Sequence, residues 1–427
     1  MKLYLGIDLG TSGVRTSVID PDGKFLSGAA VGVEAPILVD DRPCQDANLW
    51  WAAVEQCLVA QRIDLKKNGH SLDNVDALSV DGTSGTLLLT DGDLNPLTRG
   101  YMYNSGGFDR AAETVARFAP DESLARGSGS GLARLLFLQE QAGSDAAFAL
   151  HQADWIAAKL MRRGGLSDET NVLKMGYDVQ KRCWPDWFVS CGVNTDSLPE
   201  VKPVGNSFGV IDDAIAAHFG FAKHTRVVAG ATDSNAAFLA SGATEIGDAV
   251  TSLGTTLAIK LLSDKPVSDP SRGIYSHRIG DKWLPGGASN SGGGVLLDHF
   301  TTDQIRDLSQ SVDPSAPTGL DYYPLSRPGE RFPISDPKFP GRLAPRPESD
   351  AVFFQAILEG ISEIERTGYE ALADLGAPKL NRVFTAGGGA KNASWTQIRQ
   401  QKLGVAVVDS QSGEASVGAA RIAAGLI

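Results

Sequence analysis

Apolar residues gather in short runs at the start of the chain, and these runs predict three antiparallel strands. The apolar stretch 3–7 is typical of a buried strand, and 14–19 is expected to return beside it. Asp20-Pro21-Asp22-Gly23 is a turn sequence, which leads into a third strand over 24–33. The chain is therefore expected to open with an antiparallel sheet.

Helical and strand patterns alternate after this opening, and the same order starts again at Asp248. Antiparallel strands followed by alternating helices and strands predict an α/β protein with two related halves. The stretch 198–208 and the proline-rich stretch 313–347 have no period, and both are expected to be loops. The further strands are expected at 77–80, 86–90, 226–229, 382–386 and 405–408, and the helices at 48–63, 132–141, 153–161, 212–219, 234–241, 352–375, from 395 onward and at 415–426.

Two similar glycine- and threonine-containing turns lie far apart in the sequence. One is 6–13, Gly-Ile-Asp-Leu-Gly-Thr-Ser-Gly, and the other is 251–256, Thr-Ser-Leu-Gly-Thr-Thr. Each follows a β-rich run and leads into another. Glycine lets backbone amides approach an anion, and Thr or Ser hydroxyls add donors at the same place. The pair indicates a duplicated domain that binds one phosphate chain from both sides.

Composition and charge narrow the range of partners. A chain of 427 residues favours two or three domains, and 42% hydrophobic with 21% charged residues is ordinary globular composition. The net charge is 39 − 51 = −12, which disfavours nucleic acid and anionic membranes as partners but not a small polyphosphate.

The cysteines and the apolar stretches bear on location. Four cysteines are too few for a disulfide framework, and Cys183 and Cys191 lack the spacing of a zinc site, so reduced thiols are expected. No signal-peptide core follows Lys2, and no run of about 18 apolar residues occurs. We therefore expect a cytoplasmic protein without a membrane partner.

Three aspartates, Asp8, Asp81 and Asp233, each stand at the carboxyl end of an expected strand. In open α/β sheets this edge is where ligands bind. For Asp81 alone, a solvated turn aspartate is an equal alternative. Asp8 beside a phosphate-type turn, and Asp233 within Gly-Ala-Thr-Asp-Ser, favour a functional role.

Taken in order, the turns at 6–12 and 254–256 and the late run Gly387-Gly388-Gly389-Ala390-Lys391-Asn392 resemble the actin/Hsp70/sugar-kinase ATPase superfamily. Three further stretches make the chain similar to the FGGY family of carbohydrate kinases, nearest in kind to ribulose and xylulose kinases. These stretches are Val80–Gly85, the segment from Ser167-Asp168-Glu169-Thr170-Asn171 to Trp184, and Ala229–Ser234. The similarity covers essentially the whole chain.

The resemblance implies two ribonuclease-H-like (actin-like ATPase) domains with a cleft between them. The domain that binds sugar and phosphate is expected at 1–240 plus 414–427, and the nucleotide-binding domain at 241–413. The implied reaction is transfer of the γ-phosphate of ATP to a sugar hydroxyl with Mg²⁺, by a monomer or small homo-oligomer. Phosphoryl transfer asks the protein chiefly for alignment and charge neutralisation, which suits such a site.

The resemblance also implies a role for particular residues. Asp233 is expected to accept the proton of the attacking hydroxyl, and Asp8 to hold Mg²⁺. Asp8, Ser84 and Asp233 are the expected sugar contacts. ATP is expected to be bound by Thr11, Ser12, Gly254, Thr255, Gly387, Gly388 and Asn392.

The substrate cannot be copied from the family. Many members have Ser-Gly-Gln-Met-His-Gly where this chain has Asp81–Gly85, and Trp-x-Asp-x-Arg where it has Tyr101–Ser105. The Asp-Gly-Thr start is closer to the ribulose-type branch, which favours D-ribulose, with D-xylulose or a polyol as alternatives. A non-enzymatic actin-like or Hsp70-like ATP-binding protein, or a sugar sensor without turnover, is a rival interpretation.

Overall fold

The computed structural model describes residues 1–427, which fold into two compact units. Unit 1 comprises Met1–Ala240 together with Glu414–Ile427, and unit 2 comprises Ser241–Gly413. These bounds coincide with the ranges expected from the sequence. The chain thus leaves unit 1 once and returns to it for its last helix.

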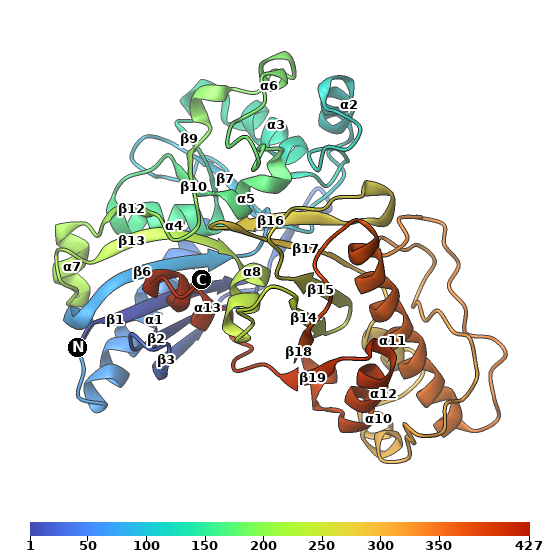
Figure 1. Ribbon diagram of the computed structural model, residues 1–427. Helices are drawn as coiled ribbons and strands as arrows, with labels where there is room; N and C mark the ends of the chain where they lie inside the picture. The colour runs from blue at the N-terminus through green and yellow to red at the C-terminus, as the bar shows by residue number, and fades with distance from the viewer. The chain divides into compact units, whose positions relative to one another are not determined.

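A mixed six-stranded sheet, in the order β12-β13-β6-β1-β2-β3, forms the centre of unit 1 (Figure 1). The first three strands are antiparallel, and β6 and β13 then continue the sheet parallel to β1. This matches the strands that the sequence predicts at the start of the chain. The bounds are β1 Leu3–Gly10, β2 Gly13–Ile19, β3 Phe25–Gly32, β6 Val75–Gly82, β12 Ser207–Val210 and β13 Arg226–Thr232.

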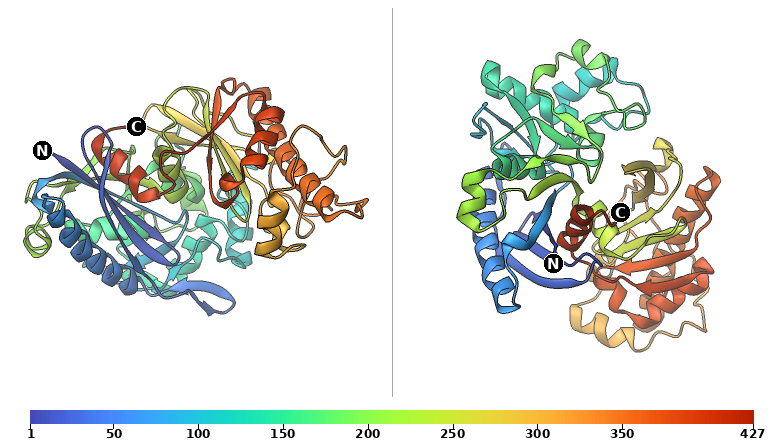
Figure 2. Two further views of the ribbon diagram at one scale, coloured as in Figure 1. Left: turned by 90° about the horizontal axis from the view of Figure 1, so that it is seen from below. Right: turned by 60° about the vertical axis from the view of Figure 1, so that its left-hand side comes forward.

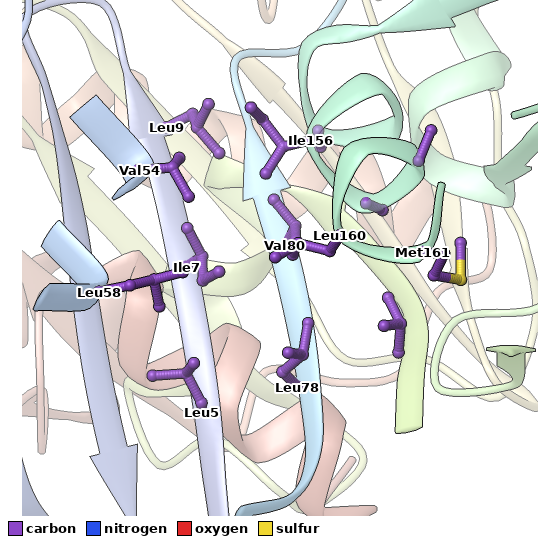
Figure 3. Packing of buried hydrophobic residues seen from close by; sticks show 14 of the residues in the cluster. Leu5, Ile7, Leu9, Val54, Leu58, Leu78, Val80, Ile156, Leu160 and Met161 are labelled. Carbon is purple, nitrogen blue, oxygen red and sulfur yellow. The ribbon is translucent and has the colours of Figure 1, made fainter. Parts of the chain in front are cut away.

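One face of this sheet packs against the helices α1 (Ala47–Lys67) and α4 (Gln152–Met161). Leu5, Ile7 and Leu9 of β1 alternate with residues that face the other way, as side chains on a strand must. Figure 3 shows these three between residues of α1 and residues of β6 and α4. The buried leucine and valine side chains here exclude water from the core and stabilise the sheet.

The opposite face of the sheet is covered by α8 (Asp233–Ala240) and by the returning helix α13 (Ala415–Ala424). Glycines make this contact possible: a Cβ added at Gly6 would lie 1.9 Å from the carbonyl oxygen of Ser416, and one at Gly418 would lie 1.8 Å from that of Ala236. The Ser17 and Ser416 hydroxyls are 2.8 Å apart. The helix therefore rests on the backbone of β1 and α8.

A second, smaller sheet in unit 1 has the order β4-β5-β8-β7-β9. It shares an apolar cluster with α2, α3 and α6, in which Phe108, Leu132 and Phe188 are buried. The short strands β10 and β11 pair in parallel, and α5 follows β10. The bounds are β4 Ile37–Val39, β5 Arg42–Gln45, β7 Leu87–Thr90, β8 Gly100–Tyr101, β9 Phe148–His151, β10 Leu166–Asp168, β11 Glu200–Lys202, α2 Asp109–Phe118, α3 Gly131–Ala142, α5 Glu169–Val172, α6 Trp187–Ser190 and α7 Asp213–Phe219.

Unit 2 repeats the strand pattern of unit 1 in a sheet of order β16-β17-β15-β14-β18-β19. The strands β14, β15 and β17 are antiparallel neighbours, and β18 and β19 run parallel to β14. The two halves therefore share five strands in one order, as the repeated sequence pattern predicts, and differ at one edge each, where unit 1 adds β12 and unit 2 adds β16. The bounds are β14 Asp248–Leu253, β15 Leu257–Leu261, β16 Tyr275–Ile279, β17 Lys282–Ala288, β18 Arg382–Ala386, β19 Ala406–Asp409, α9 Gly294–Leu297, α10 Thr302–Ser309, α11 Asp350–Asp374 and α12 Ala393–Leu403.

Figure 2 gives two further views of the same ribbon, in which α11 and α12 can be followed as neighbouring helices of unit 2. Between α10 and α11 the chain has no regular element over 313–347, as expected. The stretch 198–208 differs from its prediction as a loop, because β11 lies within it and β12 begins at Ser207.

The remaining expectations concern cysteines and the membrane. All four cysteines are free thiols, and Cys44, Cys57 and Cys191 are buried. Burial raises the pKa of each of these three thiols, which keeps them protonated. None of the helices combines the length and the apolar character needed to cross a bilayer.

Candidate active site

Neighbouring parallel strands of unit 1 bring the three aspartates to one edge of the sheet. Asp8 on β1 is in register with Asp81 on β6, and Gly82 is in register with Thr232 on β13. Asp233 follows Thr232 directly and is the first residue of α8. The edge is the carboxyl end of the parallel strands, which is where the sequence places these side chains.

Burial dominates the electrostatics of this edge. Asp8 is 6% exposed and Asp81 is fully buried. Burial raises the pKa of both carboxyls, and the negative charge of Asp8 helps raise the pKa of Asp81 well above its usual range. Neither oxygen of Asp81 has a hydrogen-bond partner of good geometry in the chain. Burial and the charge of Asp8 therefore favour the protonated form of Asp81, which is a buried group rather than a solvated turn aspartate.

Arg15 is the cation nearest to this pair. Its Nη1 lies 3.6 Å from Oδ2 of Asp8, and its Nε lies 3.5 Å from Oε2 of Glu414. The guanidinium opposes the rise in the pKa of Asp8, but less than burial promotes it. Arg15 thus forms a partly exposed ion pair with Asp8.

The turn after β6 carries several buried polar groups. Gln152, at the start of α4, accepts hydrogen bonds at Oε1 from the backbone N–H of Thr83 (3.3 Å) and from its hydroxyl (2.9 Å). The Nε2 of Gln152 has no partner in the chain, and neither has the buried hydroxyl of Ser84. Unpaired donors in a buried position are costly unless a ligand or water satisfies them.

Asp168 organises the segment that faces the end of β13. Its Oδ1 accepts from the N–H and the hydroxyl of Thr170 (2.8 and 2.6 Å), and its Oδ2 accepts from Nδ2 of Asn171 (2.6 Å). The Thr170 hydroxyl in turn accepts from the N–H of Thr232 (2.9 Å). This chain of bonds fixes the peptide next to Asp233.

The same segment leaves one polar atom open. Oδ1 of Asn171 is buried and has no partner in the chain. Burial, and then the charge of Asp154, raise the pKa of Asp168 to about 6, although its hydrogen bonds oppose the shift. The segment from Asp168 to Asn171 therefore presents both a carboxyl that can hold a proton and an unpaired amide oxygen.

Thr11 and Ser12 form the turn between β1 and β2. The backbone is held from behind, because Nε2 of Gln45 donates to the carbonyl of Thr11 (3.1 Å) and the N–H of Val33 donates to that of Ser12 (3.0 Å). Thr11 is half-buried and Ser12 is exposed. The turn is rigid, and its hydroxyls lie at the surface of unit 1.

The matching turn of unit 2 contains Gly254 and Thr255. The carbonyls of these residues accept from the N–H groups of Gly293 (2.9 Å) and Gly294 (3.0 Å). A Cβ at Gly293 would lie 2.9 Å from the Gly254 oxygen, so only glycine fits there without a shift. This glycine run supports the turn in unit 2, and the sequence interpretation missed it although three consecutive glycines were visible.

A cavity of about 620 Å³ opens beside this turn within unit 2. One wall is polar backbone, with Gly254 and Gly388, and the other is apolar, with Leu296, Ile305 and Phe354. An apolar wall with a few polar groups and a volume of several hundred Å³ is typical of a small-molecule site. The shape and chemistry suit a nucleoside attached to a phosphate chain.

Asn392 is the N-cap residue of α12 and lines the cavity. Its Oδ1 accepts from the N–H of Trp395 (3.0 Å) and caps the helix, while its Nδ2 donates to the hydroxyl of Ser309 (2.9 Å). Trp395 is 2% exposed and donates its indole N–H to Ser362, so it belongs to the core although it contacts the cavity. Gly387 has φ +84°, and a Cβ there would lie 2.6 Å from the carbonyl oxygen of Leu253. Both the turn and the helix cap therefore depend on these residue types.

Comparison with known proteins gives the family. The model for the N-terminal domain of the FGGY family of carbohydrate kinases matches residues 3–240, and the model for its C-terminal domain matches residues 249–426. The chain belongs to the FGGY family of carbohydrate kinases. As a member it is an ATP-dependent sugar kinase, a phosphotransferase, as the resemblance implied.

Relatives of this FGGY kinase are similar over nearly its whole length. It is 25% identical to the xylulose kinase of Escherichia coli (strain K12), with 99% of this chain and 89% of the relative covered. It is 23% identical to the gluconokinase of Bacillus subtilis (strain 168), with 96% and 85% covered. These relatives act on different sugars by name, so they leave the substrate of this FGGY kinase open.

Solved structures show the fold of this FGGY kinase. The xylulose kinase from Rhodospirillum rubrum has a TM-score of 0.85 at 19% identity, covering 99% of this chain and 89% of that one. The Plasmodium falciparum glycerol kinase with ADP has a TM-score of 0.85 at 16% identity, covering 100% and 89%. The two-domain, actin-like ATPase fold expected from the sequence is therefore confirmed.

The structure brings together the candidate residues of each unit of this FGGY kinase. In unit 1, Asp8 and Asp233 lie at one sheet edge with Ser84 on the turn that follows β6. In unit 2, one cavity is lined by Gly254, Thr255, Gly388 and Asn392. Gly387 is the residue before Gly388 in the sequence. The sequence interpretation did not single out Gln152 or the role of Thr170, because neither stands in a glycine-rich turn and no strand was expected at β9, which Gln152 follows.

Proposed function

We propose that this FGGY kinase transfers the γ-phosphate of ATP to a hydroxyl of a ketopentose, with D-ribulose favoured. The observation that carries the proposal is the edge of unit 1 at which Asp8, Asp81 and Asp233 end three neighbouring parallel strands. Carboxyl groups there can align a hydroxyl and receive its proton. The buried polar atoms around them suit a ligand with many hydroxyls.

Asp233 is the proposed catalytic base. The oxygen of the sugar hydroxyl forms a bond to the γ-phosphorus, the bond from that phosphorus to the β–γ bridging oxygen breaks, and the proton of the hydroxyl passes to Asp233. Its position at the start of α8, beside the peptide held by Thr170, supports this role. An ordinary carboxylate is a weak base, so its main contribution is to orient the attacking oxygen.

Asp8 is the proposed ligand of Mg²⁺, directly or through water. Carboxylate oxygens are the donors that Mg²⁺ prefers, and it commonly takes one or two of them together with substrate phosphates. The place of Asp8 supports this role, because it lies on β1 just before the turn that carries Thr11 and Ser12. When bound, the ion neutralises charge on the phosphate oxygens.

The nucleotide is proposed to bind through both glycine turns and the unit 2 cavity. Thr11 and Ser12 would donate to the γ- and β-phosphates, and Gly254 and Thr255 would offer backbone and hydroxyl donors to them. The cavity of unit 2, with its apolar wall, supports binding of the adenosine. Gly387, Gly388 and Asn392 are the proposed contacts there.

Asp8, Ser84 and Asp233 are the proposed sugar contacts. The Ser84 hydroxyl is buried without a partner, which supports its role more than a local backbone bond would. Nε2 of Gln152 and Oδ1 of Asn171 are also buried and unpaired, and we add them as one donor group and one acceptor for sugar hydroxyls.

The choice of D-ribulose over D-xylulose depends on the Asp81-Gly82-Thr83 sequence. These two sugars differ only in the configuration of one hydroxyl, and the relatives that we compared include xylulose kinases. A site built to hydrogen-bond a hydroxyl discriminates strongly against a misplaced one. We further propose that the protein acts in the cytoplasm as a monomer or small homo-oligomer, which suits its four free thiols.

The test is sugar-dependent release of ADP from ATP and Mg²⁺ with D-ribulose, D-xylulose, D-gluconate and glycerol. We expect kcat/KM for D-ribulose to exceed that for D-xylulose by about tenfold or more. Higher kcat/KM for another sugar would replace the substrate and keep the reaction. Polymer formation on ATP without sugar dependence would support the actin-like rival, and sugar binding without turnover would support a sensor.

A further inference from the structure

Arg134, on α3, is a buried cation without a counter-ion. It is 1% exposed, and burial alone lowers the pKa of its guanidinium to about 10. No carboxylate forms an ion pair with it. A buried charge without a neighbouring carboxylate is costly unless hydrogen bonds satisfy it. The hydrogen-bond partners of Arg134 therefore indicate its role.

The guanidinium of Arg134 binds backbone carbonyls from three separate segments. Its Nη1 donates to the carbonyl of Gly85, in the turn after β6. Its Nη2 lies 2.8 Å from the oxygen of Ser105, and 3.3 Å from those of Tyr103 and Gly129. The planar, rigid fork of arginine is suited to joining such fixed acceptors, and a lysine ammonium is less so.

A second arginine holds the rest of the same loop. Nε of Arg42 donates to the carbonyl of Gly106 (3.2 Å), and its Nη2 donates to that of Gly107 (2.7 Å). The Cζ of Arg42 lies 5.1 Å from the ring centre of Phe108, and that of Arg134 lies 5.7 Å from it. The carbonyls of Tyr103, Ser105, Gly106 and Gly107 are thus bound by arginines, and the Ser105 hydroxyl also donates to the carbonyl of Pro43.

The loop is also tied directly to the turn after β6. The N–H of Tyr103 donates to the hydroxyl of Thr86 (3.1 Å), which lies 2.6 Å from the hydroxyl of Thr83. Thr83 is the residue that donates to Gln152. The position of loop 103–107 is therefore coupled to the turn that carries Ser84.

We infer that Arg134 is a positioning residue that holds loop 103–107 against the turn after β6 and thereby sets sugar selectivity. The inference rests on the proposed function, because it takes this turn as part of the sugar site. Nη1 and Nη2 of Arg134 donate to backbone carbonyls, and its buried Nε has no partner in the chain, so the positioning role rests on the contacts of Nη1 and Nη2. Its effect on the reaction is exerted through the backbone it fixes.

The test compares Arg134→Lys and Arg134→Met with Arg62→Met. Arg62 is a matched control, because its Nη1 also donates to backbone carbonyls of unit 1, those of His218 (3.4 Å) and Phe219 (3.5 Å), away from this loop. For Arg134→Lys we expect the sugar KM to rise about tenfold with kcat and the ATP KM within about twofold. Arg134→Met should lose about a hundredfold in kcat/KM for the sugar. The preference for one ketopentose over its epimer should narrow in both, and Arg62→Met should match the wild type.

Hydrogen exchange of the intact protein gives a second measurement that needs no activity. Peptides covering 83–86 and 101–108 should exchange faster in Arg134→Lys than in the wild type, with the unit 2 peptides unchanged. Unchanged exchange, or a folded Arg134→Lys with wild-type sugar KM and selectivity, would overturn the inference. If Arg134→Met does not fold, the lysine variant decides. If the wild type shows no sugar-dependent ADP release, the proposed function fails, and the exchange comparison still decides whether Arg134 positions the loop.

Discussion

The aspartates of unit 1 differ in what surrounds each carboxyl group. Asp81 is buried without well-formed hydrogen bonds, whereas Asp168 is equally buried and accepts bonds from Thr170 and Asn171. Asp233 is only half-buried and starts a helix. These environments give the three groups different tasks, since burial favours a neutral carboxyl and exposure favours the carboxylate that a base needs.

Replacing Asp233 tests the proposed base. Asp233→Ala should lower kcat by about a thousandfold while the sugar KM stays within about threefold, because the carboxylate acts mainly on the transferring proton and the attacking oxygen. Asp233→Asn, which keeps the shape but cannot take the proton, should also lower kcat, by less than Asp233→Ala, because the amide oxygen can still orient the hydroxyl. Steady-state kinetics with circular dichroism as a fold check would measure this. Near-normal turnover in either variant would remove Asp233 from the mechanism.

The raised pKa of Asp168 leads us to expect that the stability of the fold depends on pH. Its pKa of about 6 in the folded protein exceeds the ordinary value of 3.8, so the folded state retains a proton that the unfolded chain has released. Its contribution to stability is therefore fully present below about pH 4 and lost as the pH rises through about 6.

The corresponding variant is Asp168→Asn. It should flatten the change in unfolding free energy between pH 4 and 6 by on the order of 1–3 kcal/mol, measured by urea unfolding at several pH values. Asn can still cap α5, and the Asn171 amide can turn its oxygen toward the new NH₂ group. Asp196→Asn, at an exposed position, is the control. The same pH profile in Asp168→Asn and the wild type would contradict the assignment.

At the scale of elements, glycines decide how closely strands, turns and helices approach. Gly6 lies under α13, and Gly389 lies between Leu253 and Trp395, where a Cβ would be within 2.8 Å of both side chains. Gly388, beside it, has no atom within 4 Å of an added Cβ and lines the cavity of unit 2. Adjacent glycines therefore serve packing in one case and ligand access in the other.

Gly388→Ala separates these two uses. The methyl group would enter the cavity rather than the core, so the ATP KM should rise several-fold, about 1 kcal/mol of binding, with Tm unchanged. Kinetics and thermal unfolding would measure both. Gly413→Ala, also in unit 2 with no atom near its added Cβ, should leave both quantities unchanged. A wild-type ATP KM in Gly388→Ala would place the nucleotide elsewhere.

Gly6→Ala tests the docking of α13 on β1. An added Cβ would meet backbone atoms at 1.9 and 2.4 Å, so the helix must move, at a cost of about 3 kcal/mol in unfolding free energy. Urea unfolding would show the loss. Gly92→Ala, in open space in the same unit, should be nearly neutral. Equal stability of both variants would mean that α13 does not pack on β1 as described.

Most strands and the sheet edge with Asp8 were predictable from the sequence. The elements and residues that were missed depend on contacts between distant parts of the chain. Short apolar runs and glycine turns predicted β1, β2 and β18 and the edge with Asp8, because these signals are local. β11 has three residues and exists because it pairs with β10, and so no period marks it. Arg134 and Gln152 likewise acquire their roles only through partners far along the chain.

At the scale of the whole molecule, two units that share five strands in one order carry different chemistry. Unit 1 presents a carboxyl-lined edge, and unit 2 presents an apolar-walled cavity beside a glycine turn. The repeat in sheet order explains why two similar turns occur in the sequence. Binding of the sugar to unit 1 and of the nucleotide to unit 2 can therefore be followed separately.

Ligand-dependent hydrogen exchange tests this division. ADP alone should protect segments of unit 2 around 254–256, 292–294 and 387–392 and, through its β-phosphate, the turn at Thr11 and Ser12. The sugar alone should protect the ends of β6 and β13 in unit 1. A ligand at 100 times its Kd stabilises the folded state by about 2.7 kcal/mol, which is enough to slow exchange measurably. Protection by ADP confined to unit 1 would reverse the proposed assignment.

The return of the chain to unit 1 has a consequence for synthesis. Because α13 is encoded after all of unit 2, a nascent chain on the ribosome has β1 and Asp8 in place long before the helix that covers their face of the sheet. Translation that stops early, anywhere in unit 2, leaves that face covered by α8 alone. Ile19 and Ala240, which pack against Val417 and Ala420 of α13, lack that cover until α13 is made, so the apolar packing of unit 1 is completed only after unit 2 has been translated.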